Sequence, residues 1–157
     1  MKKILTLLPL IILSGCQKKT TTNIKDSIVP HEKKTELKKQ SLPAGLKMEI
    51  LQKGADNAPI PEIGNTVAIH YTGWIALDDN TPGRKIDSSI ERNEPLEFTV
   101  GLGQVIKGFE EGIKRMKLGE KSRLFIDSEL GYGKKGIGLF IPPDSNLIFD
   151  VELVTIR

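Results

Sequence analysis

Residues 105–116 read Val-Ile-Lys-Gly-Phe-Glu-Glu-Gly-Ile-Lys-Arg-Met, and this stretch decides how the rest of the chain must fold. Phe109, Ile113 and Met116 recur at the spacing that lines one face of a helix, while charged residues fill most of the remaining positions. The sequence therefore predicts an amphipathic helix over residues 106–116. No other segment reads as a helix of comparable length within the folded part of the chain.

Apolar residues alternate with polar ones on both sides of this helix, which is the pattern of half-buried strands. The clearest case is the last strand, where Asp150 and Glu152 separate apolar neighbours and predict one wet face. The stretch between the first two strands, residues 54–64, is rich in Gly, Asn and Pro and predicts a loop. The predicted fold class is α+β, a curved antiparallel β-sheet with one short α-helix. The predicted strands are residues 46–52, 67–71, 96–100, 124–126 and 147–153.

The charge of the chain is unevenly distributed, although its formal net charge is only +3. Residues 17–45 carry seven lysines and three acidic residues, whereas residues 46–157 carry 14 basic and 17 acidic residues. A domain that neutralises nucleic-acid phosphates would have an excess of positive charge instead. Nucleic acid is therefore not expected as a partner.

The chain begins with the layout of a secretory signal peptide. Two lysines precede an apolar run at residues 4–13, and Leu-Ser-Gly-Cys follows at residues 13–16. An apolar helix of ten residues would be about 15 Å long, half the thickness of a bilayer core, so a permanent spanning helix is not expected. The Leu-Ser-Gly-Cys sequence resembles the bacterial lipobox, which implies lipidation of Cys16. A signal peptide with a chance cysteine is the alternative.

The sequence predicts three regions. Residues 1–15 are expected to be a lipoprotein signal peptide, and residues 16–44 the lipidated cysteine with a flexible tether, since this stretch has no aromatic residue and few aliphatic ones. Residues 45–157 form the expected folded domain. Gln17 stands where an aspartate would retain many lipoproteins at the inner membrane. We therefore expect extracytoplasmic anchoring to a bacterial membrane, with the outer membrane favoured.

Short motifs distributed over the folded region resemble the FKBP-type peptidyl-prolyl isomerases, in the order and close to the spacing of that family. The resemblance implies a sheet wrapped around a short helix and an enzyme that rotates X-Pro bonds. It also implies neither cofactor nor metal. The motifs are Ala-Ile-His-Tyr-Thr-Gly at residues 68–73, Lys-Ile-Asp-Ser-Ser at 85–89, Val-Ile-Lys-Gly-Phe-Glu-Glu-Gly at 105–112, Gly-Tyr-Gly at 131–133 and Ile-Pro-Pro at 141–143.

The resemblance also implies the residues of the site. Phe109 would form the floor under the proline ring, Asp87 would lie at the rim near the twisted carbonyl, and the Ile106 amide and the Tyr132 hydroxyl would donate to the peptide. These four are the expected catalytic residues. The loop over residues 133–143 would overhang the site. The expected substrate-binding residues are Tyr71, Ile86, Leu96, Phe98, Val105, Phe140, Ile141 and Phe149.

Several of these residues have simpler explanations. Tyr71, Phe98 and Phe149 lie at strand spacing and are also candidates for the core, and Phe109 is the inward residue of its helix. Asp87 before two serines could form an Asx turn. His70 should point to the face opposite Tyr71, which makes it a structural residue.

Three positions of the expected site differ from well-known members of the family. Phe109 stands where those members carry tryptophan, and Ile86 and Leu96 replace common phenylalanines. The cavity should consequently be less aromatic, and we expect weakened affinity for macrolide inhibitors.

The resulting expectation is a monomeric prolyl isomerase that acts on X-Pro-containing polypeptides and assists the folding of exported proteins. The alternative is a module that binds proline-containing segments or acts as a chaperone, with incidental catalysis. Retention of Asp87 and Tyr132 favours the enzyme.

Overall fold

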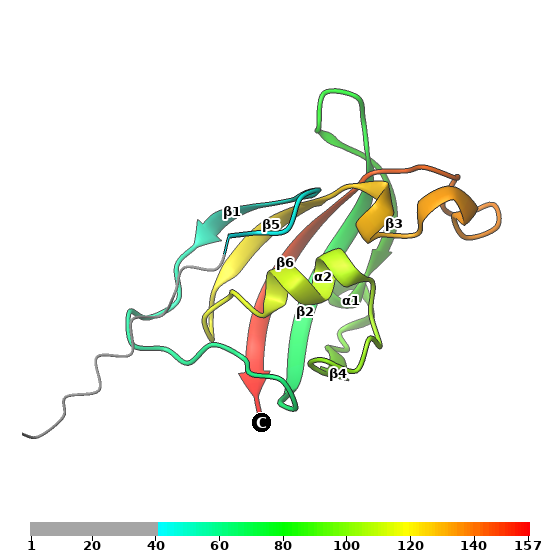
Figure 1. The fold of residues 1–157 in the computed structure, drawn as a ribbon. Helices are drawn as coiled ribbons and strands as arrows, with labels where there is room; N and C mark the ends of the chain where they lie inside the picture. Colours follow the sequence, from blue (N-terminus) through cyan, green and yellow to red (C-terminus); the bar gives the residue numbers. More distant parts are fainter. Residues whose placement is uncertain (1–40) are drawn as a thin grey trace, which may run out of the picture. The chain divides into compact units, whose positions relative to one another are not determined.

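The computed structural model describes residues 41–157, and these residues form a curved antiparallel sheet around one helix (Figure 1). The signal peptide, the lipidated Cys16 and most of the tether predicted from the sequence lie outside the described residues. The strands are β1 (Leu46–Gln52), β2 (Thr66–Ala76), β3 (Pro82–Ser88), β4 (Leu96–Thr99), β5 (Lys121–Ile126) and β6 (Leu147–Ile156). The helices are α1 (Ser89–Arg92) and α2 (Lys107–Ile113), with short 3₁₀ turns η1 (Ser128–Leu130) and η2 (Gly133–Lys135).

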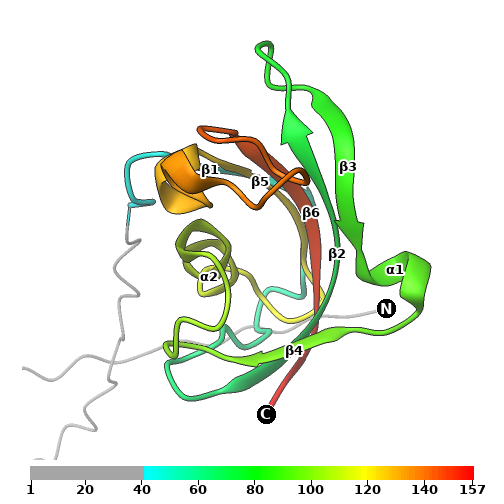
Figure 2. The ribbon, with the colours of Figure 1, turned by 90° about the vertical axis from the view of Figure 1, so that its right-hand side faces the viewer.

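The strands follow the order β1-β5-β6-β2-β3, and all of their pairings are antiparallel. The sixth strand, β4, pairs with the first half of β2, while β3 pairs with the second half. The short helix α1 connects these two strands and lets them share one edge of β2. Figure 2 shows the sheet curling around α2, which lies against its concave face. The predicted α+β fold class is therefore confirmed.

The hydrophobic core lies between α2 and the concave face. Phe109 is 3 % exposed, and Ile113 and Met116 are fully buried, as the helical spacing predicted. The inward residues of β6 complete the other side and include Leu147, Phe149, Val151 and Leu153.

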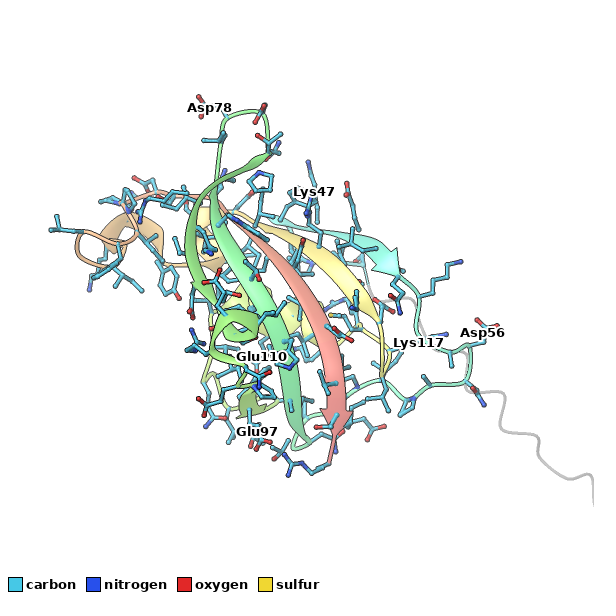
Figure 3. The ribbon with its side chains drawn as sticks, turned by 180° about the vertical axis from the view of Figure 1, so that it is seen from behind. Lys47, Asp56, Asp78, Glu97, Glu110 and Lys117 are labelled. Atoms are coloured by element: carbon cyan, nitrogen blue, oxygen red, sulfur yellow. The ribbon has the colours of Figure 1, made fainter. Side chains whose placement is uncertain are left out.

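The convex face of the sheet carries ion pairs between neighbouring strands, although Ile148 of β6 on the same face is buried. Arg123 of β5 donates two hydrogen bonds to Asp150 of β6, at 2.6 and 2.9 Å, and Lys121 lies 3.1 Å from Glu152. The predicted wet side of the last strand is thus confirmed. Figure 3 shows this face with its side chains, and it places Asp78 at the tip of the β2–β3 hairpin.

The observed helix is shorter than the predicted one at both ends. Ile106 is extended, with φ −60° and ψ 146°, and serves as the N-cap. After Ile113 the backbone tightens, because Arg115 N donates to Gly112 O and Met116 N donates to Ile113 O, each at 3.0 Å. Met116 therefore reaches the core from a tight turn instead of from a regular helix.

The strand β3 and the short helix α1 were not predicted from the sequence. The segment Pro-Gly-Arg-Lys-Ile-Asp-Ser at residues 82–88 has no apolar alternation and contains a proline and a glycine, so its local pattern favours a loop. This segment becomes a strand because the second half of β2 offers it an unpaired edge. The register of the β2–β3 pair shifts twice along its length. No helix within residues 41–157 has the length and apolarity needed to cross a membrane.

Gly73 of β2 is required by the packing of Phe149. These two residues face each other across the β2–β6 pair, and a Cβ atom built on Gly73 would lie 2.3 Å from Cε1 of the Phe149 ring. Any side chain at this position would push the ring out of the core.

We expect Gly73→Ala to lower the free energy of unfolding by roughly 1 to 3 kcal/mol, the usual range for overpacking a core. Urea unfolding followed by circular dichroism measures this change. Val154→Ala on the neighbouring strand, where the side chain is 40 % exposed, is the control and should change stability by less than about 0.5 kcal/mol. Equal stability of Gly73→Ala and the wild type would contradict the close contact.

Candidate active site

A cavity of about 380 Å³ opens beside the N-terminal end of α2 and is bounded by strands of the concave sheet. Its wall combines aliphatic and aromatic side chains with a few polar ones at the rim. The lining residues are Tyr71, Ile86, Asp87, Leu96, Gln104, Val105, Ile106, Phe109, Tyr132, Ile137, Phe140, Ile141 and Phe149.

Three aromatic rings from three elements form the floor. The ring centroids of Phe109 and Phe149 lie 4.9 Å apart, those of Tyr71 and Phe109 lie 5.7 Å apart, and both pairs meet edge to face. Tyr71 and Phe149 are 6.1 Å apart and tilted. Edge-to-face contacts are a favourable arrangement for aromatic rings and fix their orientation. The floor is therefore a rigid apolar surface.

The register of β2 brings a carboxylate to the rim of this floor. Gly73 pairs with Asp87 of β3 on one side and with Phe149 of β6 on the other. Tyr71 lies two residues before Gly73 on the same face of the sheet, so its hydroxyl is a diagonal neighbour of Asp87. The Tyr71 hydroxyl donates a short hydrogen bond to Oδ2 of Asp87.

Arg92 completes a three-residue network at this rim. Its Nη1 donates to Oδ1 of Asp87, and its Nη2 donates to the Tyr71 hydroxyl at 3.3 Å. The Ser88 amide also donates to Oδ1 of Asp87, at 2.8 Å. This backbone contact fits the Asx-type geometry considered from the sequence, but the same carboxylate also lines the cavity.

The network sets the protonation of its members. Burial is the largest influence on Asp87 and opposes ionisation, but the hydrogen bonds from Tyr71, Arg92 and Ser88 together outweigh it and hold the pKa of Asp87 below its usual value. Burial, followed by the hydrogen bond to Asp87, raises the pKa of Tyr71. The hydrogen bond to Asp87, followed by that to Tyr71, raises the pKa of Arg92. The rim thus holds one fixed negative and one fixed positive charge.

Tyr132 lies on the other side of the cavity, just before η2. Burial is the first cause that raises its pKa, and the negative charge of Asp87 is the second. Within residues 41–157 its hydroxyl makes no hydrogen bond, so its proton is available to a ligand in the cavity. Ile106 has a comparable donor, because its amide donates to no group in the described part of the chain.

The loop before Ile106 is held against α2 and against the end of β4 by side-chain hydrogen bonds. Glu110 accepts a short hydrogen bond from the Gly101 amide, and Oε1 of Gln104 accepts one from the Thr99 amide at 2.7 Å. Both contacts fix the segment that carries Gln104, Val105 and Ile106 along the cavity. Glu111 instead pairs with Lys114 and Arg115, so the adjacent glutamates do not form a carboxylate pair.

A loop over residues 133–143, which we call the flap, forms the outer wall of the cavity. An isolated bridge between Ile137 and Ile141 folds it back on itself, with Ile137 N donating to Ile141 O at 2.8 Å. Gly136 is required at the base of this bridge. Its φ is +58°, and a Cβ atom there would lie 2.1 Å from the Ile141 carbonyl oxygen.

The structure brings together eleven of the twelve site residues predicted within the described chain. The exception is Phe98, which is 4 % exposed, lies in the core and does not line the cavity. The antiparallel pairing of β4 explains this difference, because Leu96 lies opposite Ile69 while Phe98 lies opposite Val67, further from Tyr71.

Two residues of the site, Arg92 and Gln104, were missed from the sequence, and Ile137 was expected only as part of the overhanging loop. Gln104 directly precedes the Val105-Ile106 pair, and that position was a signal that could have identified it. Arg92 had no such signal, because its role depends on the turn of α1.

His70 behaves as predicted and lies off the cavity. Its Nδ1 is 3.2 Å from Oγ of Ser89, and this hydroxyl also accepts a hydrogen bond from the Tyr71 amide.

The cavity thus combines an aromatic floor with two hydrogen-bond donors and a charged pair at its rim. Residues 58–154 match the family described as FKBP-type peptidyl-prolyl cis-trans isomerase. The chain therefore belongs to this family, and it is an enzyme of that class.

Several relatives are similar to this chain over most of their length. A protein called FK506-binding protein 1 from Gibberella zeae is 45 % identical over 109 residues, which cover 69 % of this chain and 96 % of the relative. An FK506-binding protein from Neisseria meningitidis serogroup B is 47 % identical over 112 residues, 71 % of this chain and 96 % of the relative. A peptidyl-prolyl cis-trans isomerase from Schizosaccharomyces pombe is 41 % identical over 113 residues, 72 % of this chain and 96 % of the relative.

We expect the kcat/KM of the enzyme to stay constant between about pH 5 and pH 9. The lowered pKa of Asp87 keeps its carboxylate charged above about pH 4, and the raised pKa values of Tyr71 and Tyr132 keep both hydroxyls protonated up to about pH 10. The relaxation rate of an X-Pro peptide, measured in buffers of equal ionic strength, tests this. A bell-shaped profile centred near neutrality would show that a titrating group takes part in the reaction.

Proposed function

We propose that this isomerase assists the folding of exported proteins, and that it acts by desolvating and hydrogen-bonding the twisted X-Pro imide in the cavity above Phe109. The observation that carries the proposal is the pairing of a rigid aromatic floor with two available donors, the Ile106 amide and the Tyr132 hydroxyl. The proposal extends the family activity to a mechanism and a setting for this chain.

The reaction requires rotation without any bond being broken. The two isomers of an X-Pro bond differ by only about 0.5 to 1 kcal/mol, but they are separated by about 18 to 20 kcal/mol, because rotation removes the amide resonance. In the twisted state the carbonyl and the nitrogen are decoupled, and the imide is less polar than in either planar state. An apolar cavity consequently favours the twisted state over the solvated planar one.

Each proposed residue has a part in this preference. Phe109 supports the proline ring of the substrate. Tyr71 and Phe149 contact the phenyl ring of Phe109 and keep it in place. The Ile106 amide and the Tyr132 hydroxyl position the peptide chain through its carbonyls. Asp87, fixed by Arg92 and Tyr71, presents a negative field beside the twisted carbonyl carbon.

The energy required is within the reach of such a site. An acceleration of roughly a thousandfold corresponds to about 4 kcal/mol of differential stabilisation. Two hydrogen bonds that fit the twisted state better contribute about 1 kcal/mol each, and exclusion of water from the planar imide supplies the remainder. No general acid or base is needed.

The setting is proposed from the sequence of residues 1–40, which lie outside the described part. Lipidation of Cys16 after removal of a signal peptide would anchor the domain to a bacterial membrane on its extracytoplasmic side, with the outer membrane favoured. Newly exported proteins meet the enzyme there while their X-Pro bonds are still equilibrating, which is a slow step in folding.

The family binds proline-containing substrates and macrolides. For this chain we propose X-Pro polypeptides as substrates. We also propose that it binds macrolides more weakly than well-known members do, because Phe109 at the floor and Ile86 and Leu96 in the wall offer less aromatic surface than the tryptophan and phenylalanines of those members.

We expect Tyr132→Phe and Asp87→Ala each to lower kcat/KM by about fivefold to tenfold, the loss that corresponds to one hydrogen bond or a somewhat larger charge effect. The cis-to-trans relaxation of a short X-Pro peptide measures this. Asp78→Ala at the tip of the β2–β3 hairpin is the matched control, since it removes an exposed carboxylate away from the cavity (Figure 3), and it should retain wild-type activity. A wild-type protein that binds the peptide without accelerating relaxation would favour a binding module over the proposed mechanism.

We expect Cys16→Ser to shift the protein from the membrane fraction to the soluble fraction. Fractionation and mass spectrometry of the mature protein measure the anchor directly, because lipidation adds a mass that the serine variant lacks. Ser27→Ala in the same tail is the control and should remain in the membrane fraction. A wild-type protein with an unmodified Cys16 would refute the anchor and leave the isomerase activity unaffected.

A further inference from the structure

One side chain joins the flap to the opposite side of the cavity mouth. Nη2 of Arg84 in β3 donates a short hydrogen bond to the carbonyl oxygen of Phe140, 56 residues further along the chain. Among residues 41–157, this is the one side-chain hydrogen bond from outside the flap that reaches residues 136–141. The contact therefore connects two walls that local structure does not connect.

The outer half of the flap has little packing of its own. Leu139 is 98 % exposed, Phe140 is 72 % exposed and Ile137 is 43 % exposed, whereas Ile141 is buried in the core at 5 %. The internal bridge between Ile137 and Ile141 shapes the loop but does not attach it to the sheet. Apart from the buried Ile141, the hydrogen bond from Arg84 is what connects this part of the flap to the sheet.

Arg84 is available for this task because it has no competing carboxylate. The neighbouring cations at the same rim are paired, Lys85 with Glu91 and Arg92 with Asp87. Within the described residues Arg84 forms no ion pair, and its fixed fork of donors suits a carbonyl oxygen.

We propose that Arg84 is a positioning residue that holds the flap wall over the cavity and thereby sets the preference of the enzyme for the residue that precedes proline. This inference rests on the proposed function. The carbonyl that twists belongs to the residue before proline, and in the proposed mechanism it lies near Asp87 and Tyr132. The side chain of that residue then lies between β3 and the flap.

The wall that meets this side chain is apolar. It consists of Ile137, Phe140 and Ile141, all of which line the cavity. A leucine before proline buries more apolar surface against such a wall than an alanine does, and the difference exists only while the wall is held in place. Loss of the Arg84 contact should therefore weaken binding of the leucine substrate selectively.

The experiment compares two tetrapeptides that differ only in having Leu-Pro or Ala-Pro, with the mature full-length protein. We expect Arg84→Ala to lower the ratio of kcat/KM for the leucine over the alanine peptide by about fivefold, the factor that corresponds to one hydrogen bond. The loss should appear as a higher KM for the leucine peptide, with kcat for the alanine peptide within about twofold of wild type. Arg84→Lys should restore part of the ratio, because an ammonium group can also donate to a carbonyl.

Lys85→Ala is the matched control. It removes an adjacent cation whose partner is Glu91 and which makes no contact with the flap, so the ratio should stay at the wild-type value. Amide hydrogen exchange at Ile137 and Ile141 should become faster in Arg84→Ala and remain unchanged in Lys85→Ala. A general loss of stability would instead reduce activity on both peptides equally.

An unchanged peptide ratio in Arg84→Ala would overturn the inference. That result differs from failure of the proposed function, in which the wild-type protein itself accelerates neither peptide.

Discussion

The contact between the rings of Tyr71, Phe109 and Phe149 is the interaction on which the rest of the structure depends. Each ring comes from a different element, β2, α2 or β6, so their meeting fixes how the helix lies in the curve of the sheet. The contact requires that Gly73 carry no side chain, because Phe149 occupies the space beside it. The same packing is both the centre of the core and the floor of the cavity, so stability and function cannot be separated at this point.

The site also places a charge beside an apolar surface, which is costly unless the charge is compensated. Asp87 is stabilised on one side by Arg92 and Tyr71, and its side chain remains 43 % exposed. The apolar floor therefore lies next to a fixed ion pair instead of beneath a buried one. This arrangement keeps the centre of the cavity free of strongly hydrated groups while its edge retains a directed electrostatic field.

Much of the fold was predictable because its signals are local. The alternation in β6 and the spacing of Phe109, Ile113 and Met116 identified the sheet face and the helix face correctly. The strand β3 was not predictable, because its polar sequence becomes a strand only on the free edge of β2. The family motifs in the sequence located the cavity. They could not show that the register of β4 places Phe98 in the core, or that α1 brings Arg92 next to Asp87. These features arise from tertiary packing, which has no local pattern.

The strand order has a further consequence for how the chain reaches its folded state. β6 lies between β5 and β2, so residues 147–156 form the middle of the sheet although they are the last strand to emerge during synthesis. Before then, no strand connects β5 to β2. Their connection through β6 depends on contacts between segments that are distant in the sequence, and such contacts form slowly. The two parts of the sheet, β1-β5 and β2 with β3 and β4, therefore cannot be joined into one sheet until β6 has been synthesised.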